Sequence, residues 1–171
     1  MKRLWSLSIL AFALITTTTS FAQEDKSKRP SPPATLATTI NGTGILINYS
    51  QPSVKGRTIG KEIAPYGKVW RTGANEATTF EINKDVKIEG KELKAGKYSL
   101  FTIPNENEWV VIFNSVPDQW GSYRYDDSKD VLRVNVKPGK TKTFVEQMAF
   151  ANNNGKIALL WGDVQVEFGV Q

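Results

Sequence analysis

Short runs of alternating apolar and polar residues, separated by turn-forming residues, fill most of the chain after residue 33. Residues 131–137, for example, place Leu, Val and Val on one face and Arg, Asn and Lys on the other. Successive side chains of a strand point to opposite faces, so this period of two predicts strands that are buried on one side. The pair Asn41-Gly42 between two such runs predicts a tight hairpin, because both residues tolerate positive φ.

About ten short strands and no amphipathic helix are expected, which predicts an antiparallel β-sandwich or a distorted barrel. The expected strands are residues 34–40, 45–49, 78–82, 86–88, 92–93, 96–103, 109–113, 131–137, 144–150, 157–161 and 164–168. Two segments, residues 50–77 and 115–130, lack this pattern. They are long for strand connections, so we expect them to carry function or a short helix.

The N-terminus reads as an export signal. Lys2 and Arg3 precede an apolar run, and small residues lead to Ala22, after which we expect cleavage. The apolar run is well short of the roughly 20 residues that a membrane-spanning helix needs, so no transmembrane segment is expected after cleavage. We therefore expect an exported protein, periplasmic or extracellular, with a signal peptide over residues 1–22. We expect an extended polar linker over residues 23–33 and a single domain over residues 34–171.

The chain contains no cysteine and no histidine. This composition excludes Ser-His and Cys-His nucleophile pairs and the usual ligands of zinc, haem and iron–sulfur clusters. The 22 Lys and Arg and 17 Asp and Glu residues alternate along the chain, as on a solvated surface, so nucleic acid is not an expected partner. No cofactor is expected either.

One segment matches the first part of a calcium-binding loop but not the rest of it. Asp126, Ser128 and Asp130 have the spacing of the first ligands. Val131 stands where such a loop needs glycine, and no glutamate closes it at the required distance. No metal site is therefore expected.

The first long segment contains Tyr66, Trp70, Arg71, Asn75 and Glu76. An aromatic face, a guanidinium, an amide and a carboxylate on one loop suit a pocket for a small polar ligand. The same residues could instead form a plug, with Trp70 closing the end of the sandwich and Arg71 paired with Glu76. A long loop needs internal packing to be ordered, which slightly favours the plug.

The second long segment carries Trp120 and Tyr123, with Asp118 and Asp126 near them in sequence. Aromatic rings along an exposed loop suit stacking on sugar rings, with carboxylates accepting from the hydroxyl groups. The alternative is a loop held onto the sandwich by its aromatic side chains. If the two long segments meet in space, the candidate binding residues are Tyr66, Trp70, Arg71, Asn75, Glu76, Trp120 and Tyr123.

Four sequence words resemble one family. They are residues 52–57 (PSVKGR), 65–78 (PYGKVWRTGANEAT), 95–104 (AGKYSLFTIP) and 118–121 (DQWG). Together they look like the bacterial exported family of domain of unknown function 2911, over about residues 30–168. The resemblance implies an exported, single-domain β protein and no particular activity.

Three functions from different classes remain open. The first is a non-catalytic binding module for a small polar or glycan-like ligand. The second is a carboxylate-dependent hydrolase acting on a carbohydrate, for example through Glu76 with Asp118 or Asp126. The third is a structural partner in an envelope assembly, which predicts an exposed apolar face or an open edge strand.

Overall fold

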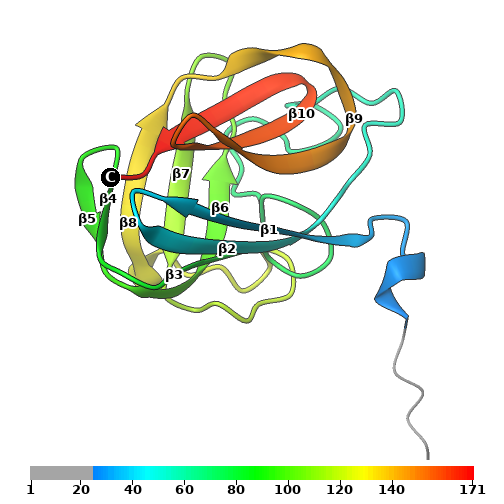
Figure 1. Ribbon diagram of the computed structural model, residues 1–171. Coiled ribbons are helices and arrows are strands. Elements are labelled where there is room, and N and C mark those ends of the chain that lie inside the picture. Colours follow the sequence, from blue (N-terminus) through cyan, green and yellow to red (C-terminus); the bar gives the residue numbers. More distant parts are fainter. Residues whose placement is uncertain (1–24) are drawn as a thin grey trace, which may run out of the picture.

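The computed structural model describes residues 25–171, so the predicted signal peptide and its cleavage site lie outside the described residues. Ten strands form three antiparallel sheets (Figure 1). The largest sheet has the strand order β1-β2-β3-β6-β7-β8. Its strands are β1 (Pro33–Ile40), β2 (Thr43–Ser50), β3 (Thr79–Ile82), β6 (Gly96–Ile103), β7 (Trp109–Asn114) and β8 (Asp130–Val136).

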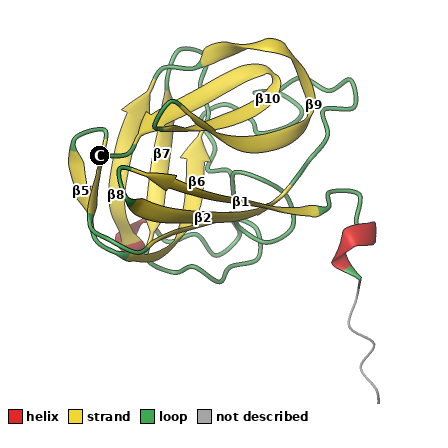
Figure 2. Cartoon of the chain, viewed as in Figure 1, coloured by secondary structure: helices red, strands yellow, loops and turns green. Residues whose placement is uncertain are grey.

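A long hairpin of β9 (Gly139–Asn153) and β10 (Lys156–Gly169) packs across one face of this sheet (Figure 1). A small hairpin of β4 (Val86–Ile88) and β5 (Lys91–Leu93) lies beside β8. The predicted antiparallel sandwich is confirmed. Within the described residues the helical segments are two single 3₁₀ turns, η1 (Lys26–Lys28) and η2 (Asp127–Lys129), shown in Figure 2. None of the helical segments in residues 25–171 could cross a membrane.

Three hairpins turn on a two-residue pair with positive φ at both positions. They are Asn41-Gly42 (51° and 76°), Glu89-Gly90 (48° and 80°) and Asn154-Gly155 (50° and 82°). This backbone is the type I′ pattern, whose twist matches that of the flanking strands. The predicted hairpin at Asn41-Gly42 is therefore confirmed, with Ile40 paired to Thr43 across it.

The main core lies between the six-stranded sheet and the β9–β10 hairpin. The Phe80 and Phe113 rings of the sheet meet edge to face at 5.1 Å, and both approach Phe168 of β10. All three side chains are buried. Each such ring stabilises the fold by about 1.5–3 kcal/mol through removal of apolar surface from water, which explains why the fold needs no disulfide.

The structure corrects the prediction of separate strands at residues 157–161 and 164–168. Both belong to β10, and the pairing with β9 continues through a register shift at Gly162. Gly162 has φ 60°. Gly-Asp reads as a turn in sequence, but a glycine of this conformation also forms a bulge inside a continuous strand.

The outer face of the six-stranded sheet carries a row of polar residues. Direct cross-strand pairing places one on each strand: Thr35, Asn48, Thr79, Ser99, Asn114 and Asp130. Directly paired residues share a face of a sheet. The row therefore crosses the whole sheet on the side away from the β9–β10 hairpin, and it is the surface on which the second long segment docks.

Candidate functional site

The two long segments meet through their backbones. Glu76 and Trp120 form an isolated antiparallel bridge. The amide of Ala77 donates to the carbonyl of Gln119 at 2.9 Å, and the amide of Gly121 donates to the carbonyl of Asn75 at 3.1 Å. We call residues 75–77 and 119–121 the loop junction. It brings together three of the predicted site residues: Asn75, Glu76 and Trp120.

Buried polar groups of the sheet hold the second segment in place. Ser99 and Asn114 are fully buried on the outer face. The Ser99 hydroxyl donates to the carbonyl of Val116 at 2.7 Å. The Asn114 amide group donates to the carbonyl of Asp126 at 2.9 Å, and its oxygen accepts from Gln119. Buried polar groups require partners, and here the loop backbone supplies them.

A small second core adds apolar packing under the same loops. Ala77, Phe101 and Ile112 are buried together on the outer face. The Tyr125 ring packs edge to face on Phe101 at 4.9 Å. The loop junction is thus anchored from beneath by both polar and apolar contacts, so its exposed side chains stand on an ordered base.

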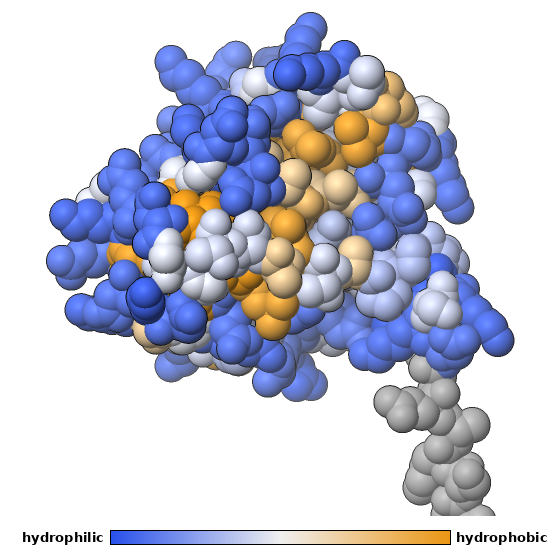
Figure 3. Space-filling view, viewed as in Figure 1, coloured by the Kyte–Doolittle hydropathy of each residue, from blue (hydrophilic) through white to orange (hydrophobic). Residues whose placement is uncertain are grey.

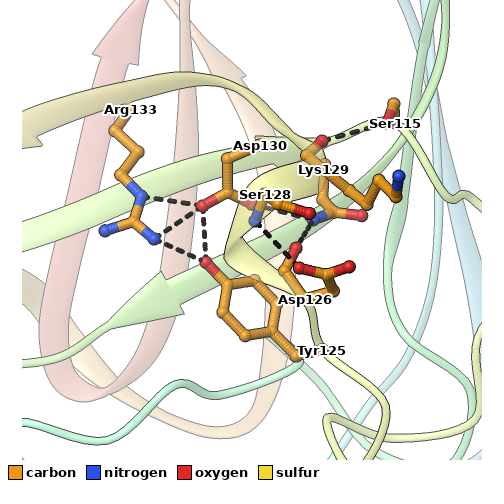
Figure 4. A network of polar contacts seen from close by, with 8 residues as sticks. Ser115, Tyr125, Asp126, Ser128, Lys129, Asp130 and Arg133 are labelled. Atoms are coloured by element: carbon orange, nitrogen blue, oxygen red, sulfur yellow. Dashed lines mark hydrogen bonds and ion pairs between the residues drawn. The ribbon is translucent and has the colours of Figure 1, made fainter.

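Tyr125, Asp130 and Arg133 form a polar cluster at the end of the second segment (Figure 4). Asp130 accepts from the Tyr125 hydroxyl, from Arg133 and from Asn114. Burial and the hydrogen bond to Asp130 raise the pKa of Tyr125. The hydrogen bond to Asp130 also raises the pKa of Arg133. This cluster closes the loop onto β8 and fastens the segment that carries Trp120.

Asp126 has a local structural role in this segment. Its carboxylate accepts from the backbone amide of Ser128 and caps η2. The hydrogen bonds from Ser128 lower the pKa of Asp126. Within residues 25–171, no group of three or more acidic residues is placed to hold a metal ion. The carboxylates of Asp126 and Asp130 thus have protein donors as their partners.

The junction and the turn that follows it present two exposed aromatic rings. Trp120 is 59% exposed and Tyr123 is 84% exposed. Gly121 between them has φ 67°, a conformation that L-residues rarely adopt. A Cβ at Gly121 would lie 3.0 Å from the Tyr123 ring and 3.5 Å from Nη1 of Arg71. Because Gly121 has no side chain, Trp120, Tyr123 and Arg71 can all lie close to this one turn.

Glu76 is the charged centre of the junction. Its carboxylate accepts from Nζ of Lys26 at 2.8 Å and from Nη1 of Arg29, which lies 3.1 Å from both carboxylate oxygens. Burial by itself raises the pKa of Glu76, but hydrogen bonds from Lys26, its own backbone and Arg29 outweigh this and lower the pKa to about 2. The guanidinium carbon of Arg29 also lies 5.9 Å from the centre of the Trp120 ring.

A cavity of about 240 Å³ opens beside Glu76. Lys26, Glu76, Thr79 and Lys97 contribute to its lining. Lys97 forms an ion pair with Asp118 at 3.5 Å. The Thr79 hydroxyl is buried and has no hydrogen-bond partner within the described residues. The junction therefore joins an aromatic surface to a small polar hollow on the same side of the sheet.

Trp70 lies apart from the junction. Its backbone pairs with Thr102 of β6, and its ring packs against the main core, stacked on Trp161 and edge to face on Trp109. Its Nε1 donates to the carbonyl of Gly73. These contacts are those of the plug alternative rather than of a ligand pocket.

Two other predicted residues also have distinct settings. The Tyr66 ring covers Gly60 and lines a different cavity of about 740 Å³, next to Phe144 of β9. Arg71 lies beside Gly121, and its Nε is buried without a hydrogen-bond partner in the described chain. Glu76 pairs with Lys26 and Arg29 and not with Arg71, the partner that the plug alternative assigned to it.

Sequence reasoning missed Lys26 and Arg29, which lie in the segment expected to be an extended linker. The structure gives this segment the 3₁₀ turn η1 and places it against Glu76. Nothing local in this polar, proline-containing segment marks the two residues as contacts of Glu76, which lies 50 positions after Lys26 and 47 after Arg29.

The fold and the junction define an antiparallel β-sandwich protein with a polar and aromatic surface built from two long loops on one sheet. The family model described as "Protein of unknown function (DUF2911)" matches residues 31–170, so the chain belongs to this family. The resemblance stated from the sequence words is confirmed. A comparison with curated proteins and one with solved structures found no match.

Proposed function

We propose that this protein is an exported, non-catalytic binding module and that the loop junction binds a small polar ligand. One observation supports this most directly. The Trp120 ring stands exposed next to the Glu76 carboxylate, on a loop that is hydrogen-bonded on both sides of it. Binding sites favour rigid aromatic surfaces flanked by a few placed polar groups.

A glycan-like ligand suits these groups chemically. A sugar ring could stack on Trp120 or Tyr123, while its hydroxyl groups bond to Asp118, Lys97 and Glu76 around the adjoining hollow. Trp70 and Tyr66 take no part in this proposal, since their rings lie elsewhere.

The state of Glu76 argues against one catalytic role, that of the general acid. A glycosidase needs one carboxyl that stays protonated near neutral pH and donates to the leaving group. The pKa of Glu76 is instead lowered to about 2, and two cations occupy its oxygens. The hydrolase alternative predicts that Glu76→Gln abolishes turnover of a polysaccharide while binding persists, and detectable turnover by the wild-type chain would contradict our proposal.

The test is a titration of the full chain with soluble oligosaccharides, followed by NMR of the tryptophan indole N–H groups. We expect a saturable shift of the Trp120 signal in the wild type, and binding measured by isothermal titration calorimetry that Trp120→Ala abolishes. Phe144→Ala is the matched control, because Phe144 is similarly exposed, at 63%, but lines the other cavity. Binding that survives Trp120→Ala would place the ligand elsewhere.

A structural role in an envelope assembly has its own supporting observation. Apolar surface gathers over the β9–β10 and β1–β2 hairpins (Figure 3). Val145, Ala151 and Leu160 line a shallow hollow of about 310 Å³ on the β9–β10 hairpin. β1 is an edge strand without a charged residue, and such edges pair readily with other strands. Stable co-purification with another exported protein, lost on Thr39→Lys, would favour this alternative.

A further inference from the structure

Residues 25–32 lie on the loop junction as a bound peptide would; we call them the N-terminal strap. Lys26 and Arg29 contact Glu76. The side-chain amide of Asn75 donates to the carbonyl of Ser31 at 3.0 Å. Outside the junction, the backbone amide of Gln51 donates to the carbonyl of Pro32 at 2.9 Å. The junction therefore contacts both the charged side chains and the backbone of this basic segment.

The Arg29 side chain fits the junction on two sides. Its Nη1 bridges the two carboxylate oxygens of Glu76, and its guanidinium carbon lies over the Trp120 ring. Its side chain is 14% exposed. A planar guanidinium can bond to a carboxylate and stack on an indole at the same time, which an ammonium group does less well. Glu76 and Trp120 thus form an arginine site that the chain itself occupies.

We infer that the ligand of the loop junction is an extended basic peptide carrying an arginine, and that the N-terminal strap is its occupant in cis. This inference rests on the proposed binding role of the loop junction and takes a basic peptide, in place of a glycan, as the ligand. The geometry favours a cation over a neutral sugar, because the ionised Glu76 would otherwise lose its counter-charges when the strap leaves. Asn75 binds the carbonyl of Ser31 and Glu76 binds the guanidinium of Arg29, so the site selects a peptide with an arginine two residues before that carbonyl.

Of the two ion pairs that the strap forms with Glu76, that of Lys26 is the more exposed. The ion pair of Lys26 with Glu76 is half open to water, with side chains 54% and 40% exposed. Pairs of this kind stabilise a contact by at most about 1 kcal/mol. A tethered segment nevertheless competes at an effective concentration of about millimolar, so an external peptide meets a mostly occupied site.

The experiment uses the full chain with Lys26→Ala and Arg29→Ala together and a synthetic peptide of residues 24–33 as the probe. We expect the peptide to shift the Trp120 indole signal and to bind this variant about tenfold more tightly than the wild type, as when an internal competitor leaves about a tenth of the molecules open. Arg29→Gln alone should give a smaller gain in the same direction. Lys26 is exposed, whereas the Arg29 side chain is only 14% exposed, so a thermal melt checks that each variant is folded.

Two controls separate specific from general attraction. Adding Glu76→Gln or Trp120→Ala to the double variant should abolish binding of the peptide, measured by isothermal titration calorimetry because Trp120→Ala removes the reporting indole. A peptide with alanine in place of Lys26 and Arg29 should not bind at all. Equal binding by the two peptides, or equal affinity of wild type and double variant, would overturn the inference.

The outcome also distinguishes this inference from the proposed function. If an oligosaccharide shifts the Trp120 signal and the peptide does not, the basic-peptide inference fails and the binding module stands. If neither ligand acts on the wild-type chain or on the double variant, the proposed function itself fails.

Discussion

The indole ring of Trp70 lies parallel to that of Trp161, with ring centres 5.2 Å apart and planes 11° from parallel. Trp161 is buried in β10, whereas Trp70 comes from the first long loop. The stack therefore fastens that loop to the main core. The loop can then continue to Asn75 and Glu76 from a fixed point, and this makes the junction with Trp120 possible.

Replacing Trp70 should cost stability. We expect Trp70→Ala to lower the free energy of unfolding by about 3 kcal/mol, because it leaves a cavity against Trp161 and Trp109. Chemical denaturation measures this. Trp120→Ala, at an exposed position, should change it by no more than about 0.5 kcal/mol. Similar losses for the two variants would contradict the assignment of one ring to the core and the other to the surface.

Docking of the strap should depend on pH through Glu76. The pKa of Glu76 is lowered from 4.5 to about 2 in the folded protein, so its ionised form is the one that the contacts stabilise. Their contribution is fully present above pH 4.5 and is lost as the pH falls from 4.5 towards 2. Lys26 and Arg29 are the basic residues that face the carboxylate.

The Trp120 indole signal reports this titration, since Arg29 lies over the ring. We expect the signal to move between about pH 4.5 and 2 in the wild type and to stay constant in Glu76→Gln. The side chain is 40% exposed, so solvent screening keeps the associated change in stability at about 1 kcal/mol or less. An identical titration in the variant would show that another group is responsible.

Gly121 should be intolerant of a side chain. Gly121→Ala forces a left-handed backbone on an L-residue, at a cost of about 1–2 kcal/mol, and also displaces the Tyr123 ring. Gly56→Ala is the matched control, because Gly56 has a similar φ of 70° and nothing within 4 Å of its Cβ position. Both variants should be destabilised, but only Gly121→Ala should shift the NMR signals of Tyr123 and Trp120. Unchanged signals in that variant would argue against the close approach.

Asp130 should contribute to the anchoring of the second loop. Asp130→Ala removes the acceptor for Tyr125, Arg133 and Asn114, and its carboxyl is nearly buried. Leaving such donors unpaired costs about 1–3 kcal/mol. Asp127→Ala, an exposed neighbour, should be close to neutral. Hydrogen exchange across residues 115–129 should also rise in Asp130→Ala, and unchanged protection there would remove the anchoring role.

Local sequence patterns predicted most of the strands and the hairpin at Asn41-Gly42, because alternation and positive-φ residues act over a few positions. They failed at Gly162, where the same residues fit a turn or a bulge and pairing with β9 decides. Local patterns also do not predict the order of the strands in the sheet, so the row of polar residues across its outer face could not be recognised from the sequence. Its members come from six separate strands.

The candidate site, too, could be predicted only in part from the sequence. Trp70 and Trp120 look alike in sequence as aromatic residues on long loops, but backbone pairing with Thr102 turns one inward and pairing with Glu76 holds the other outside. The sequence by itself determined a β-sandwich without thiol chemistry and without the usual ligands of zinc and haem, through its periodicity and its lack of Cys and His. Tertiary structure alone decided that Glu76, Trp120 and the N-terminal strap share one surface, since pairing between distant segments depends on how the whole sheet is assembled.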